Sequence, residues 1–168
     1  DSDSDGMPDE CDVDIELHEG NNLISFYALG DETDLASVFS ETSVNAVIAE
    51  GTASAIYNDA WIGGVTNVEA DKGYWVRADF SGDGVEALEM HGAMTAPVSY
   101  GLHDGGNLIS YPYAGSQALS AGIPSEASDV VDFIVGEGVA GMNLDGVWVG
   151  SLAQFGGLEG GKGYWFVA

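Results

Sequence analysis

Two sequence motifs occur twice in this chain, in the same order. Residues 17–26 read LHEGNNLISF, and residues 102–111 read LHDGGNLISY. Residues 71–76 read DKGYWV, and residues 161–166 read GKGYWF. Between the two motifs, each copy also carries a Glu-Gly pair and a tryptophan. We therefore expect two tandem copies of one structural unit, because recurrence of several motifs in fixed order is the signature of internal repetition.

The predicted units cover residues 13–98 and residues 99–168, and both are expected to be mainly β. Residues 22–27 and 107–112 are short apolar runs bounded by Gly and Asn, which is typical of strands buried on both faces. The chain has 25 glycines, enough to supply the many tight turns that short strands need. The sequence therefore predicts a mainly β fold.

Helix is expected only once in each unit. Residues 35–39, LASVF, follow two possible N-cap residues, Thr33 and Asp34. A weaker counterpart lies at residues 117–121. In full, the predicted fold class is two tandem β-rich units with one short helix each, preceded by a calcium-binding loop.

The two copies differ after their second motif. Residues 81–84, SGDG, predict a hairpin turn, after which residues 85–91 return as a strand. The second copy shows no matching return strand, so we expect one of its edges to need cover. Three sources remain open: the strand at residues 13–17, the strand near residues 98–102, and a strand from a neighbouring molecule.

The first twelve residues have the ligand spacing of a calcium loop. Calcium takes six to eight oxygen ligands, and Gly6 supplies the sharp turn that such a loop needs. The predicted ligands are the carboxylates of Asp1, Asp3, Asp5 and Asp12, the backbone carbonyl of Met7, and Asp9 through a water molecule. The alternative is an acidic, solvated tail. The sequence thus predicts one cofactor, calcium.

This loop resembles the thrombospondin type 3 repeat and, more loosely, the dockerin calcium loop, which both read D-x-D-x-D-G-x-x-D-x-x-D. An EF-hand fits less well, because residues 13–17 alternate as in a strand where an EF-hand continues into a helix. The resemblance covers residues 1–12 only and implies a calcium-stiffened spacer between surface domains. The motifs G-x-N-L-I-S and G-K-G-Y-W resemble tandem modules near the C-termini of secreted bacterial surface proteins, which implies a bacterial cell-surface location without implying an activity.

The charge of the chain restricts its partners. Three Lys and Arg residues stand against 28 Asp and Glu residues, which gives a formal net charge of −25. Nucleic acid and anionic membranes are therefore repelled. An acidic surface of this kind suits an extracellular setting rich in salt and calcium.

Cys11 is the only cysteine, so an internal disulfide is impossible. It is either a free thiol, half of an intermolecular bond, or the remnant of a longer array. The chain has neither a long apolar segment nor a basic-then-apolar leader, which favours a processed extracellular segment.

The tryptophans suggest an alternative function. Trp61 and Trp148 are flanked by glycines in predicted loops and are candidates for exposed carbohydrate-binding rings. The Tyr-Trp pairs of the second motif lie within predicted strands, where successive side chains point to opposite faces, so one ring of each pair is expected in the core.

No catalytic motif is present: the chain lacks a nucleophile elbow, a phosphate loop, paired zinc ligands and a cofactor fingerprint. His18 and His103 occupy matched positions and are expected to be structural. The sequence therefore predicts a non-enzymatic, calcium-binding structural module of the cell surface. It would serve as a building block of a filamentous assembly or adhesin and associate with itself or with a neighbouring surface protein. The alternative is a carbohydrate-binding module.

Overall fold

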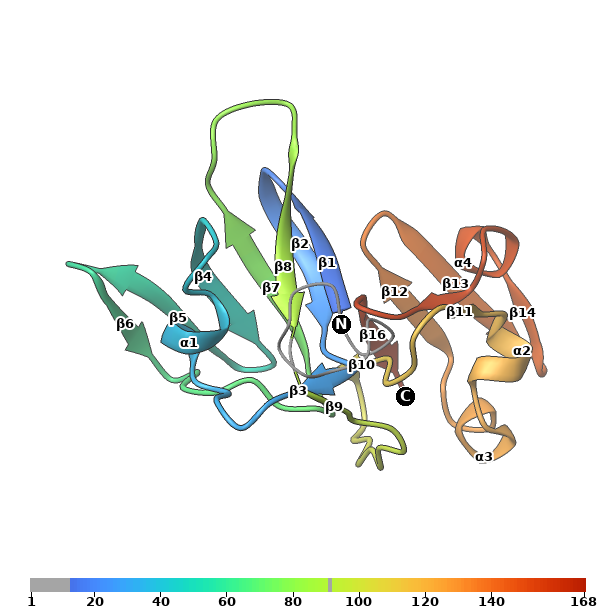
Figure 1. Ribbon diagram of the computed structural model, residues 1–168. Coiled ribbons are helices and arrows are strands. Elements are labelled where there is room, and N and C mark those ends of the chain that lie inside the picture. The colour runs from blue at the N-terminus through green and yellow to red at the C-terminus, as the bar shows by residue number, and fades with distance from the viewer. Residues whose placement is uncertain (1–12, 91) are drawn as a thin grey trace.

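The computed structural model describes residues 13–90 and 92–168 of the chain. The predicted calcium loop, residues 1–12, lies outside the described residues, and so does Cys11. The fold is mainly β, as predicted. Two five-stranded antiparallel sheets dominate it and lie in different halves of the chain (Figure 1). We call residues 13–98 the first unit and residues 99–168 the second unit.

The first unit is built on a sheet with the strand order β2-β7-β4-β5-β6. Two smaller pairs, β1 with β8 and β3 with β9, complete its strands in the described residues. The elements are β1 (Val13–His18), β2 (Gly20–Ser25), β3 (Ala28–Leu29), α1 (Leu35–Val38), β4 (Val44–Ala49), β5 (Thr52–Tyr57), β6 (Ala60–Gly63), β7 (Gly73–Ala78), β8 (Val85–Met90) and β9 (Ala93–Met94).

The second unit is built on a sheet with the order β10-β16-β12-β13-β14, and β11 pairs with β15 beside it. The elements are β10 (Gly106–Ser110), β11 (Ser116–Gln117), α2 (Leu119–Gly122), α3 (Ser125–Ser128), β12 (Phe133–Gly136), β13 (Val139–Leu144), β14 (Val147–Val149), α4 (Ser151–Gln154), β15 (Leu158–Glu159) and β16 (Gly163–Val167).

The two sheets correspond strand by strand. In each, the strand of the NLIS motif is an edge strand and pairs antiparallel with the strand of the GYW motif. Leu23 faces Trp75 in the first sheet, and Leu108 faces Trp165 at the matching place in the second. These registers are the ones that the predicted duplication leads us to expect. Superposition of the two units as one fold stays a prediction.

The helices agree with the sequence only in part. Helix α1 begins after Asp34, whose carboxylate accepts a hydrogen bond from the Ser37 backbone N–H at 3.1 Å, so Asp34 and not Thr33 is the N-cap. The second unit has three short helices in its described residues, where one was predicted. No helix in the described part of the chain has the length and apolar character needed to cross a membrane.

Each unit has its own hydrophobic core. Phe26 and Tyr74 are central to the first, and Ile134 and Tyr164 to the second. Tyr74 and Tyr164 are buried, whereas Trp75 and Trp165, their neighbours in sequence, are half-buried on the opposite faces of the sheets. This confirms that one ring of each Tyr-Trp pair lies in a core.

The strand predicted after residues 81–84 is present as β8, but it is not the return strand of a hairpin with β7. Strand β8 pairs along its whole length with β1, from Val13 opposite Met90 to His18 opposite Val85. The sequence missed this pairing because it joins segments about 70 residues apart, and local turn residues carry no information on such a contact. Among the described strands β1 pairs only with β8, so residues 13–17, one of the three candidates for covering an edge of the second unit, do not pair with that unit.

Candidate functional site

The repeated LHxGxN motif forms a closed turn in each unit. In the first unit, the Asn22 side-chain oxygen accepts the His18 backbone N–H at 2.9 Å, and its amide donates to the carbonyls of His18 and Gly20. Gly20 has a φ of 97°, a left-handed conformation that glycine adopts without strain. Asn107 closes the matching turn with the same bonds to His103 and Gly105. The motif therefore fixes the direction in which each histidine projects.

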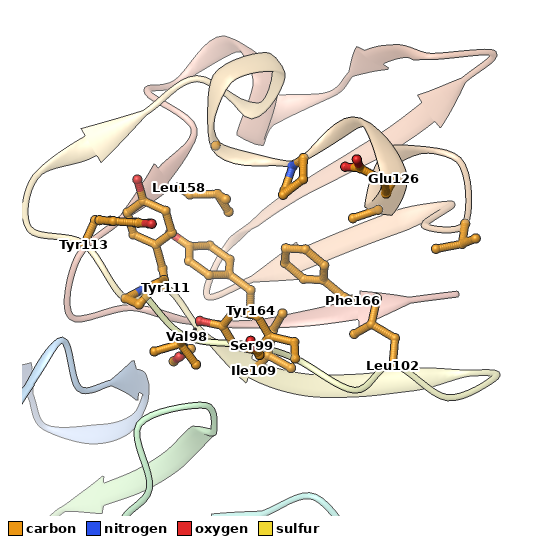
Figure 2. A pocket seen from close by; sticks show the side chains of 17 residues that line it. Val98, Ser99, Leu102, Ile109, Tyr111, Tyr113, Glu126, Leu158, Tyr164 and Phe166 are labelled. Atoms are coloured by element: carbon orange, nitrogen blue, oxygen red, sulfur yellow. Dashed lines mark hydrogen bonds between the residues drawn. The ribbon is translucent and has the colours of Figure 1, made fainter. Parts of the chain in front are cut away.

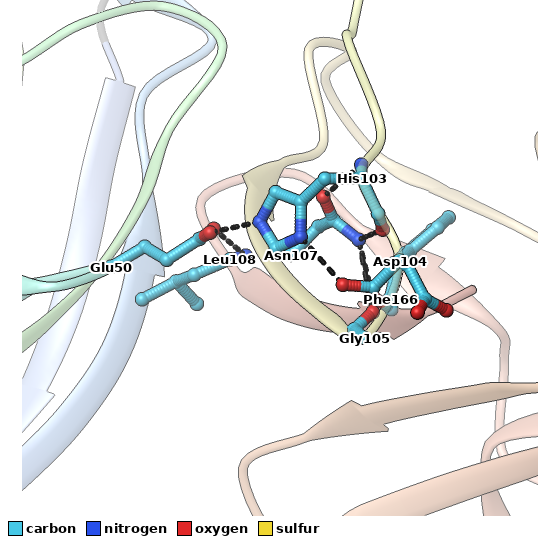
Figure 3. Close-up of polar contacts among 7 residues, drawn as sticks. All are labelled: Glu50, His103, Asp104, Gly105, Asn107, Leu108 and Phe166. Carbon is cyan, nitrogen blue, oxygen red and sulfur yellow. Dashed lines mark hydrogen bonds and ion pairs between the residues drawn. The ribbon is translucent and has the colours of Figure 1, made fainter.

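Each of these histidines meets a glutamate of the other unit. His103 Nε2 contacts the carboxylate of Glu50, which also accepts the Leu108 backbone N–H at 2.9 Å (Figure 3). Glu50 belongs to the turn between β4 and β5 of the first unit. One glutamate thus binds both the turn and the edge strand of the opposite unit.

The same contact occurs in the reverse direction. His18 Nε2 contacts the carboxylate of Glu137, which accepts the Leu23 backbone N–H at 3.0 Å. Glu137 lies in the turn between β12 and β13 of the second unit. The two contacts make a reciprocal junction, in which each unit supplies one histidine and one glutamate.

Backbone contacts continue the junction along β2 and β10, the edge strands of the two sheets. The Ser25 N–H donates to the Gly161 carbonyl at 3.0 Å, and the Ser110 N–H donates to the Asp71 carbonyl at 3.3 Å. Both hydroxyls also donate across the junction, Ser25 to the carbonyl of Lys162 and Ser110 to the carbonyl of Ala70. Each edge strand is therefore covered by the GKGYW segment of the other unit, which removes two open edges at once.

Glycine in the GYW motif is required by this close approach. A Cβ at Gly73 would lie 2.7 Å from the Ile109 carbonyl oxygen, and a Cβ at Gly163 would lie 2.6 Å from the Ile24 carbonyl oxygen. In both cases the obstructing atom is backbone of the other unit, which has no rotamer to change. The buried side chains of Leu23 and Leu108 lie beside these glycines; on the other face of the NLIS strands Ile24 is buried and Ile109 is half-buried.

The junction favours charged histidine. In His103, Nδ1 lies 2.8 Å from the Asp104 carbonyl oxygen while Nε2 faces the Glu50 carboxylate. Both partners are acceptors, so only the doubly protonated ring donates to both. The backbone contact to Asp104 and the contact to Glu50 accordingly raise the pKa of His103 above its usual 6.5.

The pKa values of His18 and Glu50 shift in the corresponding directions. The pKa of His18 is raised by its contact with Glu137 and by the backbone carbonyl of Glu19. For Glu50, burial acts to raise the pKa, but the bonds from Leu108 and His103 outweigh it and hold the pKa below the usual 4.5. The positive charge of Lys72, which belongs to the same unit, lowers the pKa of Glu50 further. The junction is thus an arrangement of paired opposite charges.

The residues predicted to bind ligands lie elsewhere. The calcium ligands Asp1, Asp3, Asp5, Met7, Asp9 and Asp12 are outside the described residues. Trp61 and Trp148 lie in strands β6 and β14 rather than in loops, and both are half-buried against the core of their own unit. The Trp61 ring centroid is 6.0 Å from that of Phe39. Carbohydrate binding by these rings stays a prediction.

The reciprocal pairing of histidine with glutamate was not predicted from the sequence. The signal was present, because His18 and His103 recur together with Glu50 and Glu137. What the sequence lacks is the information that each histidine meets the glutamate of the other copy.

Over residues 13–90 and 92–168, no three His, Cys, Asp or Glu side chains gather closely enough to hold a metal ion. Comparisons with protein-family models, with curated proteins and with solved structures found no match.

Proposed function

We propose that this chain is a non-enzymatic, calcium-binding structural module of the bacterial cell surface and a building block of an extracellular assembly or adhesin. Calcium binds at residues 1–12, through the ligands Asp1, Asp3, Asp5, Met7, Asp9 and Asp12. The two units that follow form a single block that other surface proteins or further copies contact.

The observation that carries this proposal is that the repeated motifs form the junction between the two units. The chain repeats a histidine, a glutamate and a serine, and these residues bind the two units to each other together with the backbone next to the repeated Lys-Gly pair. An enzyme concentrates such polar residues around a cavity that takes substrate. Here these residues form the junction between the two units, and a spacing element needs such a fixed junction.

Exposed apolar side chains support an assembly role. Phe133 and Met142 face each other across β12 and β13, and with Leu144 they are exposed on the face of the second sheet opposite its core. In the first sheet, Ile48 and Ile62 are exposed in the same way. Apolar side chains gathered on one face of a sheet mark contact surfaces in soluble proteins.

Calcium-dependent association is the test. With a net charge of −25, copies of this chain repel one another unless cations intervene. Size-exclusion chromatography with light scattering, at matched ionic strength, is expected to show larger species in millimolar calcium than in chelator. Asp3→Ala or Asp5→Ala removes a ligand and is expected to abolish the difference, whereas Asp83→Ala, in a loop far along the chain, leaves it unchanged.

The proposal fails on either of two results. The first is a calorimetric titration that shows no heat of calcium binding at millimolar metal, which would remove the calcium site. Alternatively, the chain stays monomeric at high concentration in calcium and high salt, which removes self-association.

A further inference from the structure

An apolar groove of about 560 Å³ runs along the second unit. One side is formed by residues 98–102, the opposite side by residues 124–130 around α3, and the floor includes Tyr164 and Phe166 (Figure 2). No described strand pairs with residues 98–102. The groove is therefore bordered by a backbone segment that makes no backbone hydrogen bond with any other described residue.

The first unit has a strand in the corresponding place. Residues 98–102 precede the LHDGGN turn as residues 13–17 precede the LHEGNN turn. Residues 13–17 belong to β1, and β8 lies against them. On its other side β8 contacts the segment before β4, since the Glu86 carboxylate accepts the Ser43 N–H at 2.8 Å. Strand β8 thus fills the slot that remains a groove in the second unit.

The core under the groove is incompletely covered. Leu17 and Ile24 are fully buried in the first unit, whereas Leu102 and Ile109, at the matching motif positions, are only partly buried. The hydroxyl of Tyr111 lines the groove, is buried, and has no hydrogen-bond partner among the described residues. In the first unit, Leu88 and Met90 of β8 belong to the same buried cluster as Leu17, Ile24 and Phe26, which occupy the matching positions.

We propose that the groove is an acceptor site for a β-strand donated by another polypeptide chain. The donated strand lies antiparallel to residues 98–102, as β8 lies on β1, and places large apolar side chains at alternate positions into the groove. This inference rests on the proposed function for one point, that the chain works in an assembly, and it names the chemistry of the partner.

Neither β8 nor residues 1–12 of the same chain can supply the strand that fills the groove. Strand β8 carries the required pattern but is paired with β1 along its length. Residues 1–5 alternate aspartate with serine, and residues 6–12 read GMPDECD, so this segment lacks large apolar side chains at alternate positions. The groove is also continuous with the junction, because Ser110 and Tyr111 line it while Ser110 binds Ala70 and the Tyr111 N–H binds Ser25 of the first unit. An incoming strand therefore adds to an interface that already exists.

The groove also specifies how the donated strand differs from β8. In the first unit, the hydroxyl and N–H of Ser43 bind Glu86, and Ser43 precedes the buried Val44. In the second unit, the residue before the buried Val131 is Val130, which has no side-chain donor. An apolar residue, and not an acid, is therefore expected where β8 has Glu86.

A peptide supplied in trans tests the proposal. The probe has the sequence of residues 83–90 with the change Glu86→Leu, and it is titrated into the whole chain while backbone amides are followed by NMR. Binding is expected to be saturable and to slow hydrogen exchange at Tyr100 and Leu102 at least about tenfold, because new cross-strand bonds protect these amides. A spin label at the N-terminus of the peptide is expected to broaden Leu102 more than Val98, as the antiparallel register requires.

Two controls separate strand addition from unspecific contact. A peptide that also carries Leu88→Asp and Met90→Asp is expected to bind at least about tenfold more weakly, because it loses the burial of two apolar side chains. In the chain itself, Val130→Asp is expected to weaken binding without unfolding the unit, since Val130 is 54% exposed.

The proposal is overturned if the probe leaves exchange at residues 98–102 unchanged at millimolar concentration, or if both peptides bind equally. Its failure is distinguishable from failure of the proposed function. A chain that assembles with calcium but ignores the peptide refutes only the acceptor groove, and a chain that binds the peptide but never self-associates refutes only self-association.

Discussion

At the scale of residues, the repeated motif LHxGxN combines a turn and a charged contact in six positions. The glycine permits the left-handed backbone, the asparagine closes the turn, and the histidine is left projecting toward the other unit. A histidine held between two acceptors is most stable when it is charged. The junction should therefore respond to pH.

The sign of that response follows from the pKa directions. A raised pKa at His18 and His103 gives stability that is complete below the unfolded value of 6.5 and is lost as pH rises through the folded value. A lowered pKa at Glu50 gives stability that is present above the unfolded value of 4.5 and is lost as pH falls through the folded value. The junction is thus most stable between about pH 4.5 and pH 6.5.

We predict that the double variant His18→Gln, His103→Gln removes the loss of stability above pH 6.5. Thermal unfolding is measured from pH 4.5 to pH 9 in wild type and variant at constant ionic strength. The difference between their Tm values is expected to be largest near pH 5 and to shrink as pH rises. Taking this difference cancels the general repulsion of a chain with a net charge of −25. A Tm difference that does not change with pH would show that the junction leaves the pKa of these histidines at its unfolded value.

At the scale of elements, the junction protects the edges of both sheets. Strands β2 and β10 are edge strands, and each has its outward N–H groups bound by the other unit. The glycines of the GYW motif let this happen, because any larger residue would meet a backbone carbonyl. The backbones of the two units approach so closely here that only glycine fits at the first position of the GYW motif.

Gly163→Ala is predicted to destabilise the chain by about 1–3 kcal/mol, the usual effect of forcing an extra carbon into a packed site. Gly84→Ala is the matched control, since a Cβ there meets nothing within 4 Å, and it is expected to change stability by less than about 0.5 kcal/mol. Denaturant unfolding of the three proteins measures both effects. Equal midpoints for Gly163→Ala and wild type would mean that the units separate freely at this point.

The sequence predicted the individual strands better than it predicted their pairing. Short apolar runs and their bounding glycines predicted the strands of the NLIS and GYW motifs, because that information is local. The pairing of β8 with β1 was missed, since a turn sequence at residues 81–84 favours a local hairpin. Trp61 was expected in a loop because of its flanking glycines, but the glycine that follows, Gly63, ends β6. A contact between distant segments decided the pairing of β8, whereas a local hairpin of β5 with β6 decided the place of Trp61.

At the scale of the whole molecule, one set of residues joins two units into a block. The sequence showed that these residues recur, but recurrence alone is equally compatible with two units that do not contact each other. The structure shows that the repeated histidine of one unit meets the repeated glutamate of the other. The crossed arrangement is a property of the pair of units, and no feature within one copy reveals it.

Amide hydrogen exchange at Leu23 and Leu108 reports whether each unit binds the edge strand of the other in solution. The Leu108 N–H is held by Glu50 and the Leu23 N–H by Glu137, each from the opposite unit. In wild type both amides are predicted to be protected. Glu50→Ala is predicted to speed exchange at Leu108 at least about tenfold and to leave Leu23 unchanged, and Glu137→Ala to do the reverse. Fast exchange at both amides in wild type, or a variant that alters only the amides of its own unit, would contradict the crossed junction.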